Sequence, residues 1–317
     1  MTKTAFTFPG QGSQAIGMGH ELAKNYKSAK AVFDEVDEAL HQNLSKLMFS
    51  GAEDELRLTE NAQPALMAVS MAVIKVLEEK GINVANNASF VAGHSLGEYS
   101  ALCAAGTFSI GDAARLLKTR GQAMQQAVPV GQGAMAAILG LEIADVTQIA
   151  KQAGQGAICE VANDNATGQV VVSGHVAAVE RAIELAKAKG AKRALLLPVS
   201  APFHCSLMCD AAEKMEEALA LVKMSDPSVP LISNVLAAPI TDAKEIRKKL
   251  VAQVTGMVRW RESILWLTNE GEVEQLVEIG AGKVLSGLAR RINRDAKTVS
   301  ISNPEQIEAF IETSSKG

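Results

Sequence analysis

The sequence contains few cysteines and no long hydrophobic run. Only four of its 317 residues are cysteines, and their scatter along so long a chain favours free thiols in a reducing cytoplasm over a disulfide framework. No apolar run approaches the roughly 20 residues that a helix needs to span a bilayer. The strand-like segment Thr4–Phe8 has no signal-peptide core before it. We therefore expect a cytoplasmic protein that does not enter the membrane.

Positive charge is not in excess either. The net charge is −4 and the isoelectric point is near 5.8, whereas a nucleic-acid-binding protein normally presents a basic face. We therefore expect no nucleic-acid partner. Hydrophobic residues, by contrast, make up 48% of the chain, which is enough for a sizeable core. The length exceeds that of a usual single domain, so we expect one large domain that carries a smaller one.

A serine lies between two glycines at a predicted strand-to-helix junction. Residues 93–97 read Gly-His-Ser-Leu-Gly and match the pattern G-x-S-x-G, with an apolar segment at 90–92 before them and a helix-compatible run at 98–105 after them. A sharp turn of this kind strains the backbone at Ser95 and lifts its hydroxyl into a cleft. The first N–H groups of the helix lack partners and can face an oxyanion. We predict that Ser95 is a nucleophile; the alternative is a simple turn that needs glycines.

A serine nucleophile needs a base, and the sequence has only five histidines. His94 adjoins the serine, so its side chain should point the other way, and it stays the alternative base. His204 lies in a proline-containing loop between a predicted strand and a helix, where sheet-based enzymes place working residues. We predict that His204 is the base. It could instead be a polar loop residue, or join Cys205 and Cys209 in a metal site, but their spacing lacks the second pair of a zinc site, so we expect no metal.

The order serine then histidine is that of α/β-hydrolases, which place an acid between the two. The acids of this interval do not follow an obvious core strand: Asp112, Asp145, Glu160 and Asp164. Glu98, in the first turn of the helix after the serine, is expected to interact with the helix dipole. We therefore predict a serine–histidine dyad whose histidine is oriented by a neutral group.

A glycine-rich loop follows the first predicted strand. Gly10 and Gly12 flank Gln11, but Ala15 breaks the dinucleotide-binding pattern G-x-G-x-x-G. Such a loop can also bring the backbone and one side chain close to a reacting centre, and the amide of Gln11 suits that role. A tight turn with a surface glutamine is the alternative.

Strands alternate with helices through most of the chain, which predicts a largely parallel sheet with helices on both faces. Residues 129–199 differ, because their pattern β-α-β-β-α-β is ferredoxin-like and can form an inserted domain. The two middle strands of this pattern are expected to flank a turn at 163–168. We predict an α/β-hydrolase-like catalytic domain formed by 1–128 and 200–317, and a ferredoxin-like small domain at 129–199.

Four motifs occur in the chain in a fixed order. They are Phe-Pro-Gly-Gln-Gly-Ser-Gln at 8–14, Gly-His-Ser-Leu-Gly-Glu-Tyr at 93–99, Gly-Ala-Met at 133–135 and Ile-Gly-Ala-Gly-Lys-Val-Leu at 279–285. Together they resemble the malonyl-CoA:acyl carrier protein transacylases, from Thr4 to about Arg291. The first two motifs are specific as a pair, whereas G-x-S-x-G alone is weak. Phe203 departs from the family, which often has a small residue there, and it would narrow the acyl pocket.

The resemblance implies a two-step acyl transfer. Ser95 would take the malonyl group from coenzyme A as an ester, and the phosphopantetheine thiol of acyl carrier protein would then accept it. His204 would act as the general base and then as the acid for the departing thiol. Gln11 and the backbone N–H of Leu96 would form the oxyanion hole. No cofactor is implied, because malonyl-CoA is a substrate.

The resemblance also implies two binding roles. Arg120 matches the arginine that grips the free malonyl carboxylate, and the planar fork of a guanidinium suits that task. Composition alone does not choose Arg120 over Arg115. Acetyl would leave the buried guanidinium unpaired, so the arginine would select malonyl. Gln253 matches the region that holds the histidine in the family.

Acyl carrier protein is acidic, so its docking surface should be basic. The candidates are Arg193, Arg290 and Arg291, although ordinary solvated surface charge would explain each of them as well. The rival functions are a serine esterase or thioesterase, an acyltransferase of a polyketide synthase, and a silent carrier-binding module. The last is disfavoured because Ser95 and His204 are both present. We expect a monomeric transferase of fatty acid synthesis.

Overall fold

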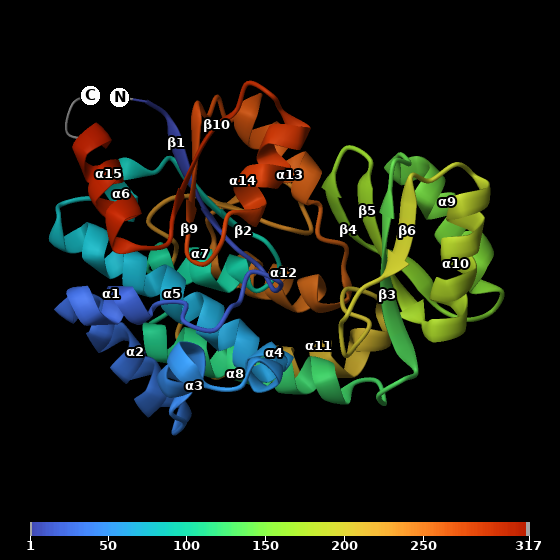
Figure 1. Ribbon diagram of the computed structural model, residues 1–317, viewed down its shortest axis with the longest axis horizontal. Coiled ribbons are helices and arrows are strands. Elements are labelled where there is room, and N and C mark those ends of the chain that lie inside the picture. The colour runs from blue at the N-terminus through green and yellow to red at the C-terminus, as the bar shows by residue number, and fades with distance from the viewer. Residues whose placement is uncertain (1, 315–317) are drawn as a thin grey trace.

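The computed structural model describes residues 2–314. It shows a mixed α/β fold with two sheets, which occupy the centre and the right of Figure 1. The larger sheet has the order β10-β9-β1-β2-β7-β8, and all its neighbours run parallel except β7 and β8, which confirms the predicted mostly parallel sheet. Its strands are β1 (Thr4–Phe8), β2 (Phe90–Gly93), β7 (Leu231–Ile232), β8 (Pro239–Ile240), β9 (Gln275–Ile279) and β10 (Lys297–Ile301).

Helices cover both faces of this larger sheet. One face carries the N-terminal helices α1 (His20–Asn25), α2 (Lys27–Leu40), α3 (Leu44–Ser50), α4 (Glu53–Arg57) and α5 (Thr59–Glu79), together with α6 (Val84–Asn87), α7 (Gly97–Ala104), α8 (Ile110–Gln126), η1 (Ser206–Met208), α11 (Cys209–Ala220), α12 (Ala243–Thr255) and α15 (Pro304–Ser314). The other face carries α13 (Trp260–Thr268) and α14 (Val284–Ile292). Strand β10 and helix α15 were not expected from the sequence.

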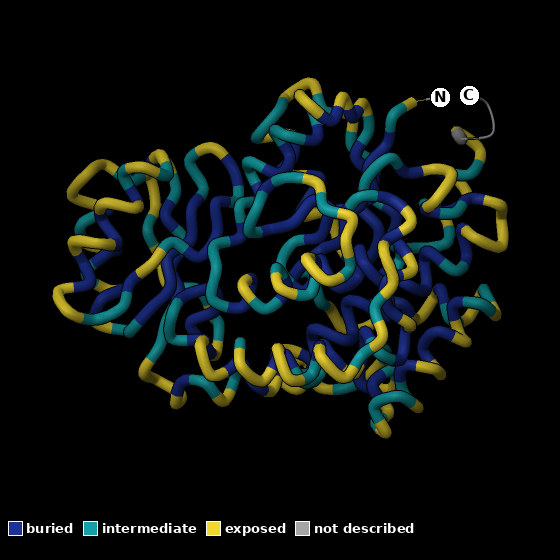
Figure 2. The backbone as a smooth tube through the Cα atoms, turned by 180° about the vertical axis from the view of Figure 1, so that it is seen from behind, coloured by how far each residue is buried: buried dark blue, intermediate teal, exposed yellow. Residues whose placement is uncertain are grey.

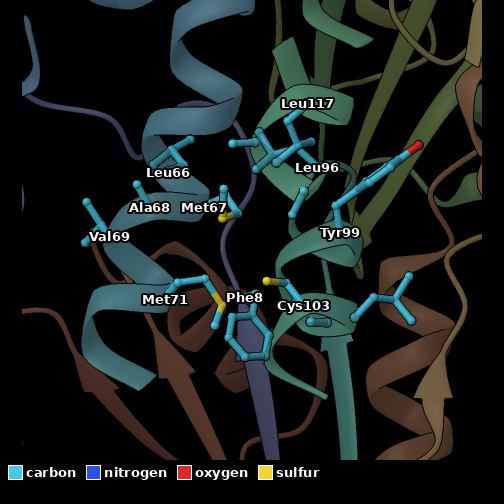
Figure 3. Close-up of a cluster of buried hydrophobic side chains, with 14 of the residues drawn as sticks. Phe8, Leu66, Met67, Ala68, Val69, Met71, Leu96, Tyr99, Cys103 and Leu117 are labelled. Carbon is cyan, nitrogen blue, oxygen red and sulfur yellow. The ribbon is translucent and has the colours of Figure 1, made fainter. Parts of the chain in front are cut away.

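Successive residues of β1 face opposite sides of the sheet, as the pleat requires. Phe6 and Phe8 join the core under α5, whereas Ala5 joins the core under α13 and α14. Helix α5 is buried nearly all round, which explains why its sequence lacks a polar face. Figure 3 shows Phe8 of β1 gathered with Met67 of α5 and Tyr99 of α7 in one cluster. This packing places β1, β2 and α7 rigidly against one another.

The smaller sheet has the order β4-β5-β3-β6 and is antiparallel throughout. Its strands are β3 (Gly133–Leu139), β4 (Cys159–Ala166), β5 (Gln169–His175) and β6 (Arg193–Leu196). Helices α9 (Ile143–Gly154) and α10 (Val176–Ala188) pack on its outer side, around a separate apolar core. Residues 2–314 therefore form three apolar cores, one on each face of the larger sheet and one under the smaller sheet.

The prediction of a turn at 163–168 is wrong for residues 163–166, which belong to β4. Strand β4 continues to Ala166, because bulges between Val161 and Asn163 and between Asp164 and Ala166 absorb the polar residues without ending the pairing. The backbone of Asp164 also bonds to the carbonyl of Val258 in the main part of the molecule. The stretch expected to be a turn instead links the smaller sheet to the segment between α12 and α13.

The carboxyl ends of β1, β2 and β7 meet at one edge of the larger sheet, because the three strands are parallel neighbours. Loops at such an edge are where open α/β sheets bind ligands. The central strands of both sheets are largely buried, whereas the edge strand β6 and the outer side of the helices are exposed to solvent (Figure 2). No helix within residues 2–314 is both long and apolar enough for a membrane crossing.

Candidate active site

Ser95 lies at a tight junction between β2 and α7. Its φ is 55°, a left-handed conformation that is uncommon for a residue with a side chain. The flanking glycines are required by close approach: a Cβ on Gly93 would lie 1.9 Å from the carbonyl carbon of Gly97, and one on Gly97 would lie 2.2 Å from the carbonyl oxygen of Phe8. Strand, turn and helix can meet this closely only without those side chains, so the pattern G-x-S-x-G has a steric cause here.

The backbone of Ser95 is held on both sides by amide side chains. Its N–H donates to Oδ1 of Asn234 at 2.7 Å, and its carbonyl accepts from Nε2 of Gln253 at 2.9 Å. Asn234 follows β7 and Gln253 belongs to α12, so two distant segments stabilise the strained turn.

His204 faces the serine hydroxyl. Its Nε2 lies 2.7 Å from Oγ of Ser95, and its Nδ1 lies 2.9 Å from the carbonyl oxygen of Gln253 and 3.2 Å from that of Gly256. A carbonyl can only accept, so Nδ1 carries the proton and Nε2 of the neutral ring is free to accept one from the serine. His204 itself has a φ of 58°. Both members of the pair are therefore held in strained backbone.

The electrostatics keep His204 neutral. Burial, followed by the positive charge of Arg120, lowers the pKa of His204 to about 3. The ring therefore remains a proton acceptor well below neutral pH. Among the described residues, its hydrogen-bond partners are the serine and the two carbonyls, and none is a carboxylate.

Arg120 of α8 is the buried cation of the site, with an exposed fraction of 1%. Its Nη1 donates to Gln63 at 2.8 Å, and its Nη2 donates to Oε1 of Gln253 at 2.8 Å and to Oγ of Ser95 at 3.1 Å. Within the described chain it forms no ion pair, and its Nε has no hydrogen-bond partner. Arg115, one turn earlier, is exposed and paired with Asp112. The structure therefore separates the two arginines that composition could not.

These side chains open into a cleft of about 440 Å³ between the two sheets. Phe203 lies in its wall, where a smaller residue would leave more room. The lining comprises Gln11, Gly12, Gln14, Arg57, Gln63, His94, Ser95, Leu96, Arg120, Met124, Met135, Asn163, Asn165, Val171, Leu197, Pro198, Val199, Phe203 and His204. Sequence reasoning did not select Arg57, an exposed cation of this wall.

Gln11 and Leu96 both line the cleft beside Ser95. The side chain of Gln11 accepts a hydrogen bond from Thr59 through Oε1 at 2.9 Å. In the part of the chain that the structure describes, the backbone N–H groups of Gln11 and Leu96 donate to no protein acceptor. Two unpaired donors at the carboxyl ends of β1 and β2 could therefore face one oxyanion.

His94 does not contact the serine hydroxyl. Its Nε2 lies 2.8 Å from Oδ1 of Asn165, and its ring packs near Trp260. Burial lowers its pKa. Asn165 belongs to the part of β4 that had been expected to form a turn, so this contact could not have been anticipated from the sequence.

The sequence analysis gave no role in the site to two polar residues that lie beneath the cleft. Glu98 does lie in the first turn of α7, but it is 1% exposed and accepts hydrogen bonds from Gln253 and from the backbone N–H of Asn234. Burial raises the pKa of Glu98 to about 7. Asn234 itself carries no motif signal; only its place after a strand could have marked it.

The basic residues chosen for docking lie outside the lining of the cleft. Arg193 is exposed on β6, and Arg290 and Arg291 are exposed at the end of α14. Arg290 donates to Thr298, and Arg291 donates to Gln169 of the smaller sheet. Gln169 and Arg193 both pair with Leu139 of β3, so Arg193 and Arg291 lie at the same end of the smaller sheet.

A metal site is not apparent in residues 2–314, where no three His, Cys, Asp or Glu side chains are placed to share an ion. Cys205 is buried and donates to the carbonyl of Pro202, whereas Cys209 is exposed. The two cysteines therefore do not face a common point with His204.

The chain is similar to known proteins over nearly its whole length. A family described as "Acyl transferase domain" matches residues 5–303. A malonyl CoA-acyl carrier protein transacylase of Bacillus subtilis is 51% identical over 99% of this chain and 98% of its own. The crystal structure of an acyl-carrier-protein S-malonyltransferase from Bartonella henselae is 57% identical, with a TM-score of 0.96 over 98% of this chain and 99% of its own. A malonyl-transacylase solved with a type II polyketide synthase acyl-carrier protein is 42% identical, with a TM-score of 0.95 over 98% of this chain and 100% of its own.

Proposed function

The chain belongs to the acyl transferase domain family and is an acyltransferase, and we propose that it moves a malonyl group from malonyl-CoA to the phosphopantetheine thiol of acyl carrier protein. One observation carries the choice of substrate. The buried guanidinium of Arg120, which has no carboxylate partner among the described residues, lies 3.1 Å from the hydroxyl of Ser95. A substrate with a free carboxylate near its thioester fits both groups at once.

In the first half-reaction Ser95 is the nucleophile. Its Oγ attacks the thioester carbonyl carbon while its proton passes to Nε2 of His204, and the carbonyl oxygen becomes an oxyanion. The N–H of Leu96 and Gln11 stabilise that charge. The intermediate then collapses, the carbon–sulfur bond breaks, and His204 returns the proton to the coenzyme A sulfur. A malonyl-serine ester remains.

In the second half-reaction the carrier's thiol replaces coenzyme A. Nε2 of His204 takes the thiol proton, and the sulfur attacks the ester carbonyl. The carbon–oxygen bond to Ser95 then breaks, and the serine oxygen recovers the proton. Because coenzyme A leaves before the carrier enters, the kinetics are ping-pong. The proposed steps use only side chains and backbone N–H groups of the protein, so we propose that no cofactor takes part.

The site also supports selection of malonyl over acetyl. A bound malonyl group would pair its carboxylate with Arg120, whereas an acetyl group would leave a buried cation without a counter-charge. Gln253 holds His204 through its backbone carbonyl and Arg120 through its side chain. It therefore acts as the neutral residue that orients the histidine in place of an acid.

We also propose a specific fold for each of the two sheets and its helices. The antiparallel order β4-β5-β3-β6, with its two helices on one side, supports a ferredoxin-like small domain at 129–199. The mostly parallel sheet with a serine turn after β2 supports an α/β-hydrolase-like domain from 1–128 and 200–317. We also propose that the protein is a monomer. The free cysteines support a place in the cytoplasm, and the negative net charge supports the absence of a nucleic-acid partner.

Arg193, Arg290 and Arg291 are the proposed carrier contacts, because they are exposed and positive. We assign the enzyme to fatty acid synthesis. Service to a polyketide synthase is the second candidate, because a structural relative at 42% identity was solved with a carrier of that kind. Comparing discharge rates by a fatty acid carrier and a polyketide carrier separates the two.

Intact-mass measurement after brief mixing with malonyl-CoA tests the proposal. The wild type should gain one malonyl adduct, which holo-acyl carrier protein discharges; Ser95→Ala should gain none, and acetyl-CoA should label neither. Free malonate that accumulates without an adduct would indicate a hydrolase instead. Labelling by acetyl-CoA to the same extent as by malonyl-CoA would contradict the proposed selection of malonyl by Arg120, but not the role of Ser95 as the nucleophile.

A further inference from the structure

Glu98 is a buried carboxylate that the proposed mechanism does not use. It lies in the first turn of α7, is 1% exposed, and does not line the cleft. One of its oxygens accepts from the backbone N–H of Asn234 at 3.2 Å, and the other accepts from Nε2 of Gln253. A buried carboxylate is costly unless donors satisfy it, so its position needs a reason.

Asn234 and Gln253, which donate to the carboxylate of Glu98, also hold the peptide groups of Ser95. Asn234 accepts from the N–H of Ser95 at 2.7 Å and donates to the carbonyl of Gly93 at 2.6 Å. Gln253 donates to the carbonyl of Ser95 at 2.9 Å. Glu98 therefore contacts both residues that keep the serine in its left-handed conformation.

The hydrogen bond from Gln253 also determines where the backbone N–H of Leu96 points. The carbonyl of Ser95 and the N–H of Leu96 belong to one planar trans peptide, so they point in opposite directions. Because Gln253 draws the carbonyl to the buried side, the N–H is turned to the cleft, where Leu96 is part of the lining. That N–H is the proposed oxyanion donor.

Glu98 also helps to fix the orientation of the side-chain amide of Gln253. An ionised carboxylate accepts only and a guanidinium donates only, so when Glu98 is ionised Nε2 faces Glu98 and Oε1 faces Arg120. The observed contacts follow this rule. With the amide reversed, the carbonyl of Ser95 would face another oxygen and lose its donor.

We propose that Glu98 is a positioning residue: by anchoring Gln253 and Asn234 it aims the N–H of Leu96 at the oxyanion and holds Ser95 for attack. The inference rests on the proposed acyl transfer. Glu98 reaches the site through Asn234 and Gln253, which both hold Ser95, and Gln253 also accepts from Arg120. We place the effect of Glu98 on the chemical step, because the Ser95–Leu96 peptide that it aims meets an oxyanion only in the transition state. A purely structural role would change stability and leave the chemical step unchanged.

The test compares Glu98→Gln with Glu278→Gln. Glu278 is the matched control, because it is also 1% exposed and accepts two backbone hydrogen bonds, from Leu285 and Ser286 of α14, yet does not line the cleft. The rate constant of malonyl-enzyme formation is measured by rapid quench and intact mass. Malonyl-CoA affinity is measured by calorimetry in a Ser95→Ala background, and stability by thermal unfolding.

We expect Glu98→Gln to slow acylation by about 10²-fold, the scale of a misplaced catalytic group, with unchanged malonyl-CoA affinity. Glu278→Gln should lose stability and keep its acylation rate. Equal acylation rates in the two variants would overturn the proposal, as would a loss of affinity that accounts for the slower rate. A wild type that forms no malonyl-enzyme would instead overturn the proposed function.

Glu98→Asp keeps the inference testable if Glu98→Gln does not fold. It retains the charge but withdraws the carboxylate by one methylene from Gln253. Slower acylation with unchanged affinity is expected here too, and a rate equal to that of the wild type would contradict the positioning role.

Discussion

Nη2 of Arg120 lies 3.1 Å from Oγ of Ser95, and the guanidinium is buried beside the candidate nucleophile. In a malonyl ester the free carboxylate is one methylene away from the ester carbonyl. A cation that already touches the serine oxygen is therefore within reach of that carboxylate. This relationship makes the acyl specificity of the enzyme directly testable.

Arg120→Ala should lower kcat/KM for malonyl-CoA by about 10²- to 10³-fold, because loss of one partner of a buried ion pair costs about 3–5 kcal/mol. Acetyl-CoA makes no such pair, so its kcat/KM should not fall. Initial rates of coenzyme A release with each substrate measure the ratio. Arg115→Ala, on the exposed side of the same helix, is the control and should leave kcat/KM unchanged for both substrates. An equal fall for both substrates would argue against the carboxylate contact.

The pH dependence of acylation should lack the usual histidine limb. Burial and the charge of Arg120 lower the pKa of His204 to about 3, and a histidine accepts a proton only above its pKa. Protonation of His204 should therefore cause no fall in rate between about pH 8 and about pH 5, whereas an imidazole with a pKa of about 6.5 would lose tenfold per unit below that value. Burial raises the pKa of Glu98 to about 7, so a fall near pH 7 that disappears in Glu98→Gln belongs to Glu98 and not to the histidine.

Malonyl-N-acetylcysteamine is the substrate for this measurement, because it carries no phosphate that titrates in the same range. The profile of kcat/KM reports groups of the free enzyme. A limb near pH 6.5 that belongs to His204 would show that the ring is better solvated than the structure indicates.

Gly93→Ala should unfold far more easily than the wild type. The new Cβ would lie 1.9 Å from backbone atoms of Gly97, and backbone cannot move aside as a flexible side chain can, so the cost should exceed the about 1–3 kcal/mol of ordinary overpacking. Gly287→Ala is the contrasting variant, because Gly287 is helical and nothing lies within 4 Å of its Cβ position. The free energy of unfolding of Gly287→Ala should be about 0.5–1 kcal/mol higher than that of the wild type. Urea unfolding of both variants measures the difference, and a gain at Gly93 would contradict the steric argument.

Charge reversal should separate carrier docking from acylation. Arg193→Glu, or Arg290→Glu combined with Arg291→Glu, should raise KM for holo-acyl carrier protein by about tenfold at low salt, because surface charge steers an acidic partner. Malonyl-enzyme formation from malonyl-CoA should stay the same. Lys30→Glu, on α2, which lies away from both β6 and α14 in Figure 1, is the control. A carrier KM that does not change would place the dock elsewhere, and Arg57 at the cleft would be the next candidate.

The sequence was most informative where structure depends on neighbours along the chain. The strand before Ser95, the two glycines and the helix after it predicted a strained junction, and the structure has that junction between β2 and α7. The alternating helices and strands predicted the mostly parallel sheet. The polar run at 163–168 misled for the same reason: its residues are typical of turns, but pairing with β5 through two bulges kept it a strand.

Residues that act through distant partners could not be assigned from composition. Arg120 and Arg115 are equivalent in the sequence, and only the packing of α8 buries one and exposes the other. Glu98 looked like a helix-dipole residue, because nothing near it reveals that Asn234 and Gln253 will supply two donors. Their role exists only once three segments have come together.

The sequence by itself therefore determined the family resemblance, the class of fold and the nucleophile turn, since the steric limits of a G-x-S-x-G junction act over a few residues. The tertiary structure decided that His204, 109 residues after Ser95, is neutral and 2.7 Å from its hydroxyl, and that an unpaired guanidinium shares the same oxygen. Distances of this kind depend on how the two sheets and α8 and α12 pack. Burial then sets the pKa of the histidine, and burial is a property of the whole fold.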